Sequence, residues 1–396
     1  MRLKALGGTA LALLLAACAP APPSQAPPLP ESSARFDLTP VDFAALPGWQ
    51  ADSIAAALPT FLRSCAAMDR ASGRPADEPI ARRAAFGSYG DWRPVCAAAR
   101  KLPDASEATA RNFFTAYFTP FAIHDRGKDS ALVTGYYEPV LAGARHRGGA
   151  YQVALLKRPP DLSRYPTRAA IEAGALDRYR LQLVWVDPIE AFFLEIQGSG
   201  RIRFADGDEL RLGYAATNGA AYVSIGRVLV VCGAMTPEQA SLASLKDWLR
   251  SHPGQAKIVM DANPSYVFFR AQPGDGPIGT QGAVLSPGRS LAVDPDFIML
   301  GAPVFLDLAQ PGQAPIQRLT VAQDTGGAIK GGLRGDMFWG GGEGAAAMAG
   351  GMRAFGRAYV LLPKNLNGQA GDRDDRLNAR LESPLKSRIN EVTCPL

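Results

Sequence analysis

AQDTGGAIKGGLRGDMFWGGGEGAAAMAG, from Ala322 to Gly350, sets two aspartates, Asp324 and Asp336, on a backbone crowded with glycine. Glycine loses more conformational freedom on folding than any other residue, so such a run needs a reason. Asp324 ends the strand-like segment RLTVAQD, and residues 325–335 separate it from Asp336. A loop of this composition lets the backbone approach a bulky ligand and brings both acids back to one place.

Two carboxylates held close together repel each other, so one of them keeps its proton at a higher pH than usual. A protonated carboxylic acid is the group that cleavage of a glycosidic bond requires. The plainer alternative is that Asp324 and Asp336 are turn formers or salt-bridge partners.

The same stretch contains a loose match to a dinucleotide-binding loop, GEGAAA, from Gly342 to Ala347. We set this match aside for two reasons. The preceding RGDMFWG is a poor candidate for a central strand, and no acidic residue follows a second strand about twenty positions later to hold a ribose.

Composition narrows the function classes. The 396 residues carry a net charge of +5 with no block of lysine or arginine, which argues against nucleic-acid binding. This weak positive charge is compatible with an anionic polymer as ligand but does not require one. The three histidines, His124, His146 and His252, are far apart in sequence, and no metal-ligand spacing occurs. We therefore expect no metal and no cofactor.

The N-terminus, MRLKALGGTALALLLAACAP, has a basic head, an apolar stretch and then a cysteine. This pattern predicts a signal peptide over residues 1–17. The segment from Leu15 to Cys18 resembles a bacterial lipoprotein cleavage box, so Cys18 is the expected lipidation site, and Ala19 after it favours the outer membrane. The alternative is an ordinary signal peptide. Residues 18–35 are rich in proline and predict an extended tether.

Four cysteines remain in what would be an oxidising compartment. Cys65 and Cys96 lie in helical-looking segments and enclose a loop with little apolar content, so we predict a disulfide between them, with Cα atoms within about 7 Å. Cys232 lies in the strand-like run RVLVVCGAM, which predicts a buried free thiol. Cys394 is then also free.

The apolar pattern changes along the chain. Residues 36–124 show helical spacing, including SEATARNFFTAYFTPFAI. From residue 132 the pattern predicts short strands with one clear helix, ASLASLKDWLRSH, after a capping box at Thr236–Gln239. The predicted strands are ALVTGYYEPVL, AYQVALLKRP, AFFLEIQGSGRIRF, ELRLGYAATNG, AYVSIGRVLVV, SLAVD, PVFLDL, RLTVAQD and AYVLLP. Short strands at uneven spacing favour barrels over a doubly wound sheet.

Several motifs in fixed order carry a family resemblance. They are TGYYEPVL (134–141), FFLEIQGSGRI (192–202), YAATNGAAYVSIGR (214–227), MDANPSYVFFR (260–270), VDP (293–295), QDTGGAIKG (323–331) and RGDMFWGGGE (334–343). Over roughly residues 55–365 the chain resembles the membrane-bound lytic transglycosylase A family. Its C-terminal module is named for three aspartates, which here are Asp294, Asp324 and Asp336.

The resemblance implies a mainly β fold with helices. A double-psi β-barrel domain would span residues 36–137 and 266–396, with the three-aspartate module at about 286–365. A second small β-barrel domain, residues 138–265, would be inserted into it, and the N-terminal region would be helical.

The resemblance also implies a reaction. The family cleaves the β-1,4 bond between N-acetylmuramic acid and N-acetylglucosamine in peptidoglycan without water and leaves a 1,6-anhydro ring. Asp336 would be the acid and then the base, and Asp324 would tune it. The expected groove contacts are Thr134, Tyr136, Tyr137, Gln197, Ser199, Asn218, Asp294 and Lys330. For Tyr137 a core position, and for Asn218 a simple turn, remain open.

The expected partners are peptidoglycan glycan strands, the outer membrane through an N-terminal lipid, and enzymes of cell-wall synthesis or hydrolysis. The resemblance places the protein as a monomeric, exo-acting outer-membrane lipoprotein that faces the periplasm of a Gram-negative bacterium. Two other functions stay open: a glycan hydrolase that uses both aspartates and a water, and a non-catalytic lipoprotein that only binds peptidoglycan.

Overall fold

The computed structural model describes residues 36–71, 81–160, 165–274, 276–366 and 393–396. The predicted signal peptide, tether and Cys18, and most of the polar tail, lie outside these residues. Within them, strands form two sheets, and helices pack against both.

The first sheet has eight strands. In spatial order they are β1 (Phe36–Pro40), β2 (Phe118–Asp125), β14 (Arg353–Pro363), β11 (Pro303–Ala309), β12 (Ile316–Asp324), β10 (Ser290–Val293), β13 (Arg334–Gly341) and β3 (Ala131–Glu138). Strand β14 also pairs with β3, so the strands from β14 round to β3 close on themselves. This closure makes the first barrel.

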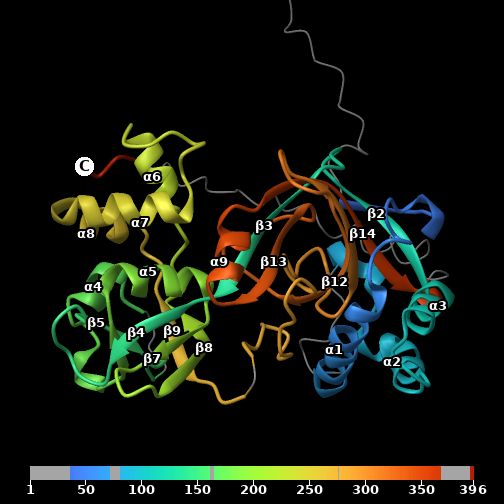
Figure 1. Cartoon of the computed structure of the whole chain (residues 1–396), viewed down its shortest axis with the longest axis horizontal. Coiled ribbons are helices and arrows are strands. Elements are labelled where there is room, and N and C mark those ends of the chain that lie inside the picture. Colours follow the sequence, from blue (N-terminus) through green and yellow to red (C-terminus); the bar gives the residue numbers. More distant parts are fainter. Residues whose placement is uncertain (1–35, 72–80, 161–164, 275, 367–392) are drawn as a thin grey trace, which may run out of the picture.

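The second sheet has six strands, β5 (Val153–Leu156), β6 (Gln182–Val186), β4 (Val140–Ala144), β7 (Gly200–Arg203), β8 (Glu209–Thr217) and β9 (Val267–Ala271). A bridge between Lys157 and Phe269 joins its two edges and makes a second, smaller barrel. Figure 1 shows the two barrels side by side. The chain changes barrel between Glu138 and Val140, near the predicted boundary; the domain limits themselves stay a prediction.

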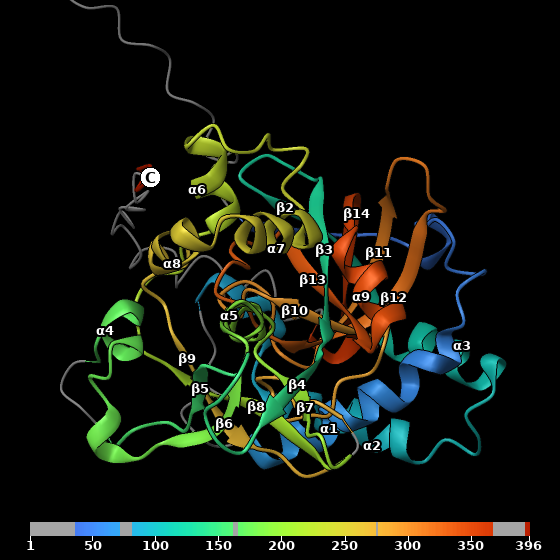
Figure 2. The same ribbon diagram turned by 60° about the vertical axis from the view of Figure 1, so that its left-hand side comes forward.

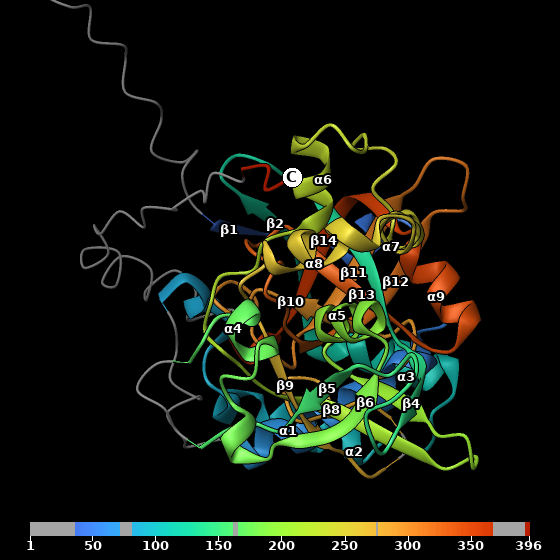
Figure 3. The same cartoon turned by 90° about the vertical axis from the view of Figure 1, so that its left-hand side faces the viewer.

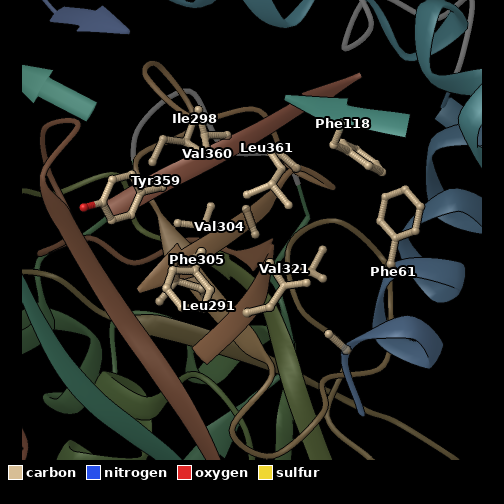
Figure 4. Packing of buried hydrophobic residues seen from close by; sticks show 14 of the residues in the cluster. Phe61, Phe118, Leu291, Ile298, Val304, Phe305, Val321, Tyr359, Val360 and Leu361 are labelled. Carbon is tan, nitrogen blue, oxygen red and sulfur yellow. The ribbon is translucent and has the colours of Figure 1, made fainter. Parts of the chain in front are cut away.

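The main core fills the first barrel and continues under the N-terminal helices α1 (Leu58–Ala71), α2 (Arg93–Arg100) and α3 (Glu107–Tyr117). Phe61 from α1 packs edge-on against Phe118 at 5.6 Å between ring centroids. Figure 4 shows these rings beside the aliphatic side chains of the barrel strands. The helical region is thereby fixed to the barrel by apolar burial.

Helices also cover the second barrel. Helices α5 (Pro188–Gln197), α6 (Ile225–Val231), α7 (Leu242–Ser251) and α8 (Pro253–Asp261) share one apolar cluster. Figure 2 shows α5 between α7 and the strands β4 to β8, and Figure 3 shows α6, α7 and α8 on one side of that barrel. A short helix, α4 (Arg168–Glu172), lies beside β5.

The predicted run of helix through Ile123 is wrong after Tyr117. Residues Phe118–Asp125 form β2, which pairs with both β1 and β14. Pro120 disfavours a helical conformation at the residue before it, and two neighbouring strands satisfy the backbone instead.

Two predicted strands are helices. Residues 191–197 of AFFLEIQGSGRIRF belong to α5, and residues 225–231 of AYVSIGRVLVV form α6; only Gly200–Arg203 of the first segment is a strand. Apolar runs of this length do not separate strand from buried helix by periodicity. The missed signals are N-caps, because the side chains of Asp187 and Ser224 accept backbone hydrogen bonds at the starts of α5 and α6.

Two smaller predictions also need correction. Thr236 and Gln239 make the reciprocal bonds of a capping box, but residues 237–239 form a turn, and α7 begins after Ser241. RGDMFWG is not a poor strand: it is most of β13, which lies between β10 and β3. Glycine fits at positions 335 and 340 of this strand because the side chains of Leu291 and Pro287 pack closely against its backbone.

The structure contains two disulfides among the described residues. Cys65 and Cys96 pair with their Cα atoms 5.5 Å apart, within the separation predicted. The prediction of free thiols at Cys232 and Cys394 is wrong, because these two are also paired, with Cα atoms 5.0 Å apart. Cys232 is not inside a strand: it caps the C-terminus of α6, where Cys394 can reach it.

Candidate active site

The pairing of three strands brings the two acids together. Ala292 on β10 is the register partner of Asp324 on β12 and also of Asp336 on β13. Neighbouring strands lie about 4.8 Å apart, so the two acidic residues are separated by roughly two strand spacings, with the small Ala292 between them. The glycine-rich loop thus returns Asp336 to the same region as Asp324, with one strand between them, as the sequence predicts.

Thr134 and Arg334 hold Asp336. The Thr134 hydroxyl donates to Oδ1 of Asp336 at 2.8 Å, and Nη2 of Arg334 donates to the Thr134 hydroxyl oxygen at 2.8 Å. A guanidinium can only donate, so the proton of the Thr134 hydroxyl must point to Asp336. This leaves Oδ2 of Asp336 as the oxygen able to carry an acidic proton.

The surroundings keep Asp336 protonated to an unusually high pH. Burial raises its pKa from 3.8 to about 6, against the Thr134 hydrogen bond and the Arg334 charge, which lower it. The negative charge of Asp324 adds to the rise. A carboxylic acid with this pKa can donate a proton near neutral pH.

Asp324 has a different environment. Its Oδ1 accepts from the backbone and hydroxyl of Thr280 and from the backbone of Thr325, each at 2.9 Å, and its Oδ2 accepts from the Tyr136 hydroxyl at 3.0 Å. Burial raises the pKa of Asp324, while these donors lower it. Both oxygens of Asp324 accept hydrogen bonds from the protein, so the effect of Asp324 on Asp336 is through its negative charge, which raises the pKa of Asp336.

Several predicted groove residues serve the protein itself. Tyr136 is buried, with its hydroxyl on Asp324, and Thr134 supports Asp336. Tyr137 packs against α9 (Glu343–Gly350) as a core residue, and its backbone N–H donates to Gln197 Oε1 at 3.1 Å. Gln197 thus faces β3.

Asn218 and Asp294, predicted as groove contacts, have side chains that bond to the protein's own backbone. Nδ2 of Asn218 donates to two backbone carbonyls, and its Oδ1 accepts from the backbone of Tyr266 and Ala220, so its side chain has no capacity left. Asp294 is 3% exposed, and Oδ2 accepts from the backbone of Gly331 at 2.8 Å. Both side chains fix loops.

The remaining residues are placed as follows. Ser199 is buried in the turn between α5 and β7, and Lys330 is exposed in the loop between β12 and β13. Two residues that touch the site, Arg334 and Thr280, were not among the predicted site residues. Arg334 stands two positions before Asp336, where a side chain on the same face of the strand would be expected to touch it; nothing near Thr280 marks it in advance.

No metal or membrane-spanning element is found in the part of the chain that the structure covers. No group of three or more His, Cys, Asp or Glu side chains is arranged to hold a metal ion. The helices there are all too short or too polar to cross a bilayer.

Comparison with known families gives two matches. A model of the MltA-specific insert domain matches residues 132–270, and a model of the 3D domain matches residues 289–362. The second match contains both Asp324 and Asp336.

Similar sequences include proteins named membrane-bound lytic murein transglycosylase A. The one from Vibrio cholerae is 35% identical over 250 residues, covering 61% of this chain and 68% of the relative. The one from Escherichia coli K12 is 36% identical over 238 residues, covering 58% and 64%.

Solved structures agree with these matches. A membrane-bound lytic murein transglycosylase from Agrobacterium tumefaciens aligns with a TM-score of 0.76 and 29% identity over 84% of this chain and 99% of that one. MltA from Neisseria gonorrhoeae aligns with a TM-score of 0.69 and 34% identity over 83% and 93%. Escherichia coli MltA with bound chitohexaose aligns with a TM-score of 0.63 and 26% identity over 84% and 95%.

Proposed function

The chain belongs to the family of membrane-bound lytic murein transglycosylase A, and from this premise we propose that Asp336 is its single acid and base. The protein is a peptidoglycan lytic transglycosylase. It cleaves the β-1,4 bond between N-acetylmuramic acid and N-acetylglucosamine without water and forms a 1,6-anhydro ring.

One carboxyl group is enough for this reaction. Protonated Oδ2 of Asp336 gives its proton to the glycosidic oxygen as the bond to the muramyl anomeric carbon breaks. The ionised Asp336 then takes the proton of the muramyl C6 hydroxyl, whose oxygen attacks the same carbon and closes the ring. Atoms balance without a water molecule, and Asp336 ends protonated again.

The observation that carries this assignment is the contrast between the two carboxylates. Asp336 has one oxygen held by Thr134 and the other without a partner among the described residues, and its pKa is raised to about 6. Asp324 has four donors on its two oxygens. A hydrolase would need Asp324 to activate a water, but Oδ1 already accepts three hydrogen bonds, and only Oδ2, which has the single Tyr136 donor, has room for another.

Activity should depend on pH through Asp336. The acid must be protonated to act, so kcat/KM should fall about tenfold per pH unit above a pH near 6, and should be retained below it. The rate of release of soluble muropeptides from sacculi, measured between pH 4.5 and 8, tests this. A rate that stays level up to pH 8 would remove Asp336 as the general acid.

Two substitutions should shift, in opposite directions, the pH at which kcat/KM begins to fall; we call this falling part of the pH profile the pH limb. Thr134→Val removes a hydrogen bond that lowers the pKa of Asp336, so the limb should move to higher pH. Asp324→Asn removes a negative charge that raises this pKa, so the limb should move to lower pH, with turnover also reduced. Full pH profiles of both variants are the measurement. Shifts in the same direction would contradict the assignment of charges around Asp336.

Peptidoglycan is the substrate, and a relative has been solved with chitohexaose, a chain of six sugars. We propose that the glycan strand lies between the two barrels, against the loop of residues 325–333. We also propose that the protein works as a monomer beside enzymes of cell-wall synthesis or hydrolysis.

The relatives are named as membrane-bound, and this chain is a membrane-associated protein of a Gram-negative bacterium. The finer proposal is an outer-membrane lipoprotein, anchored through Cys18 and reaching into the periplasm on the tether of residues 18–35. It rests on the sequence alone, because Cys18 lies outside the described residues.

Cys18→Ser should abolish attachment, because the serine cannot take the lipid. Fractionation should move the variant from the outer-membrane fraction to the soluble periplasmic fraction, while activity on purified sacculi stays unchanged. If the variant stays with the membrane after a salt wash that strips wall fragments, the lipid is not the anchor.

A further inference from the structure

A buried charge cluster lies where the chain passes from one barrel to the other. Glu138 is the last residue of β3, and Figure 1 shows β3 leading from the first barrel to β4 in the second. The Glu138 side chain is only 5% exposed, and it faces Arg211 Nε at 3.0 Å and Arg201 Nε at 3.4 Å. Both arginines come from the second barrel, where β7 and β8 place them directly opposite each other.

Both arginines of the cluster also contact other groups. Arg201 also approaches Glu209 at 3.4 Å, and Arg203 pairs with the same carboxylate at 2.9 Å. Arg211 donates to the backbone carbonyl of Gly274. Burial raises the pKa of Glu138, and the two arginines lower it. Removing the Glu138 charge would therefore take from Arg211 its carboxylate at 3.0 Å and would leave Arg201 with Glu209.

The cluster touches the strand that carries Asp336. Gly341 ends β13 and is the register partner of Glu138. A Cβ atom at Gly341 would lie 3.2 Å from Nη2 of Arg201 and 3.4 Å from Oε2 of Glu138. A side chain at Gly341, five residues from the acid, would be in tight contact with both groups and would require them to shift by a few tenths of an ångström.

The cluster is held by charge more than by directed hydrogen bonds. Among the residues that the structure describes, Oε1 of Glu138 and the Nε groups of both arginines find no hydrogen bond of good geometry, although the ion-pair distances are 3.0 and 3.4 Å. Coulomb attraction falls slowly with distance and sets no angle, whereas a hydrogen bond weakens steeply when bent. Such a contact attracts the two barrels to each other without fixing a single angle between the charged groups.

We propose that Glu138, Arg201 and Arg211 are positioning residues that set the spacing of the two barrels and thereby the binding of glycan strands long enough to contact both. This rests on the proposed function, because it takes the space between the barrels as the substrate groove. The cluster does not touch the reacting atoms. Its loss should change binding of long strands and leave the chemistry at Asp336 alone.

The test compares two glycine substitutions that keep every charge. Gly341→Ala inserts a methyl group where Arg201 and Glu138 pack, and the φ angle of Gly341 lies outside the left-handed region, so the backbone accepts alanine. Gly344→Ala, on α9, is the matched control, because its Cβ would meet nothing within 4 Å. Glu138→Gln removes the charge and should have the larger effect on KM. Thermal unfolding shows whether this variant folds.

Kinetics should be measured on two substrates, long glycan strands and a fragment of two disaccharides. For Gly341→Ala we expect KM on long strands to rise about 3- to 10-fold with kcat within about twofold, and KM on the fragment to stay unchanged. The pH limb near 6 should not move. Gly344→Ala should match the wild type on both substrates.

Two results would overturn the proposal. One is an unchanged KM on long strands in Gly341→Ala. The other is an equal rise on both substrates, which would indicate a general disturbance of the site. Failure of the proposed function is visible separately, because the wild-type protein would then release no anhydro products from either substrate.

Discussion

Asp336→Asn should reduce the release of anhydro-muropeptides by at least ~10² while leaving glycan binding intact. The asparagine Oδ1 can still accept from the Thr134 hydroxyl, so the local geometry is kept. What is lost is the proton on the second oxygen, which the leaving sugar needs and which the C6 hydroxyl later returns. The measurement is product release from sacculi at pH 5.5, together with a pull-down of the variant on sacculi.

The same substitution should stabilise the fold at neutral pH. The pKa of Asp336 is about 6 in the folded state and near 3.8 when exposed, so the folded state favours the protonated form. Its contribution to stability is therefore present below pH 4 and is lost as the pH rises through 6. Asparagine cannot ionise, so the free energy of unfolding at pH 7 should rise by up to ~3 kcal/mol.

Thermal unfolding at pH 7 and pH 4 checks this, because the gain should be large at pH 7 and small at pH 4. A variant that loses activity and also loses stability at pH 7 would indicate a structural role for Asp336. A variant that keeps near-normal release of anhydro products would remove it from the mechanism.

Removing the disulfide between Cys65 and Cys96 should cause a large loss of stability. The two cysteines are separated by 31 residues and are both buried, between α1 and α2. Cross-linking a loop of this length restricts the unfolded chain and is worth roughly 3–4 kcal/mol in the loop-entropy model. Cys65→Ala with Cys96→Ala should lower the free energy of unfolding by about that amount. The Cys65–Cys96 bridge lies in the helical region, so turnover at 20 °C should stay close to normal.

Urea unfolding of the double variant and the wild type gives the difference directly. The second disulfide supplies a control, because Cys394 is exposed and Cys232 partly so, and a mild reductant should open this bridge first. Protein reduced and alkylated only at Cys232 and Cys394 separates effects of reductant from effects of the Cys65–Cys96 bridge. A change below ~1 kcal/mol in the double variant would contradict the stabilising role.

Local chemistry made part of this fold predictable. Asp324 and Asp336 could be singled out because ordering a glycine-rich backbone between two acids costs conformational entropy, which a bound ligand would explain. Strands such as PVFLDL and RLTVAQD could be predicted from their β patterns. The helices α5 and α6 were missed because their apolar runs resemble buried strands. Their N-caps, Asp187 and Ser224, are local signals for helix, and the packing of both helices against α7 and α8 buries their apolar faces.

The support around the acids depends on contacts between distant parts of the chain. Thr280 reaches Asp324 across 44 positions, and Glu138 meets Arg201 across the junction of the barrels. Neither pairing follows from spacing in the sequence. Conversely, Asn218 and Asp294 look like ligand contacts in a motif, yet their side chains hold backbone in place.

The most direct measurement is the mass of the glycan ends released when the wild-type protein digests sacculi in ¹⁸O-labelled water. Attack by the muramyl C6 hydroxyl predicts 1,6-anhydro ends, each one water lighter than a reducing end and free of ¹⁸O, and predicts that Asp336→Asn releases almost none of them. Reducing ends that carry ¹⁸O would contradict the account, because they would show that water, activated by a second group, is the nucleophile.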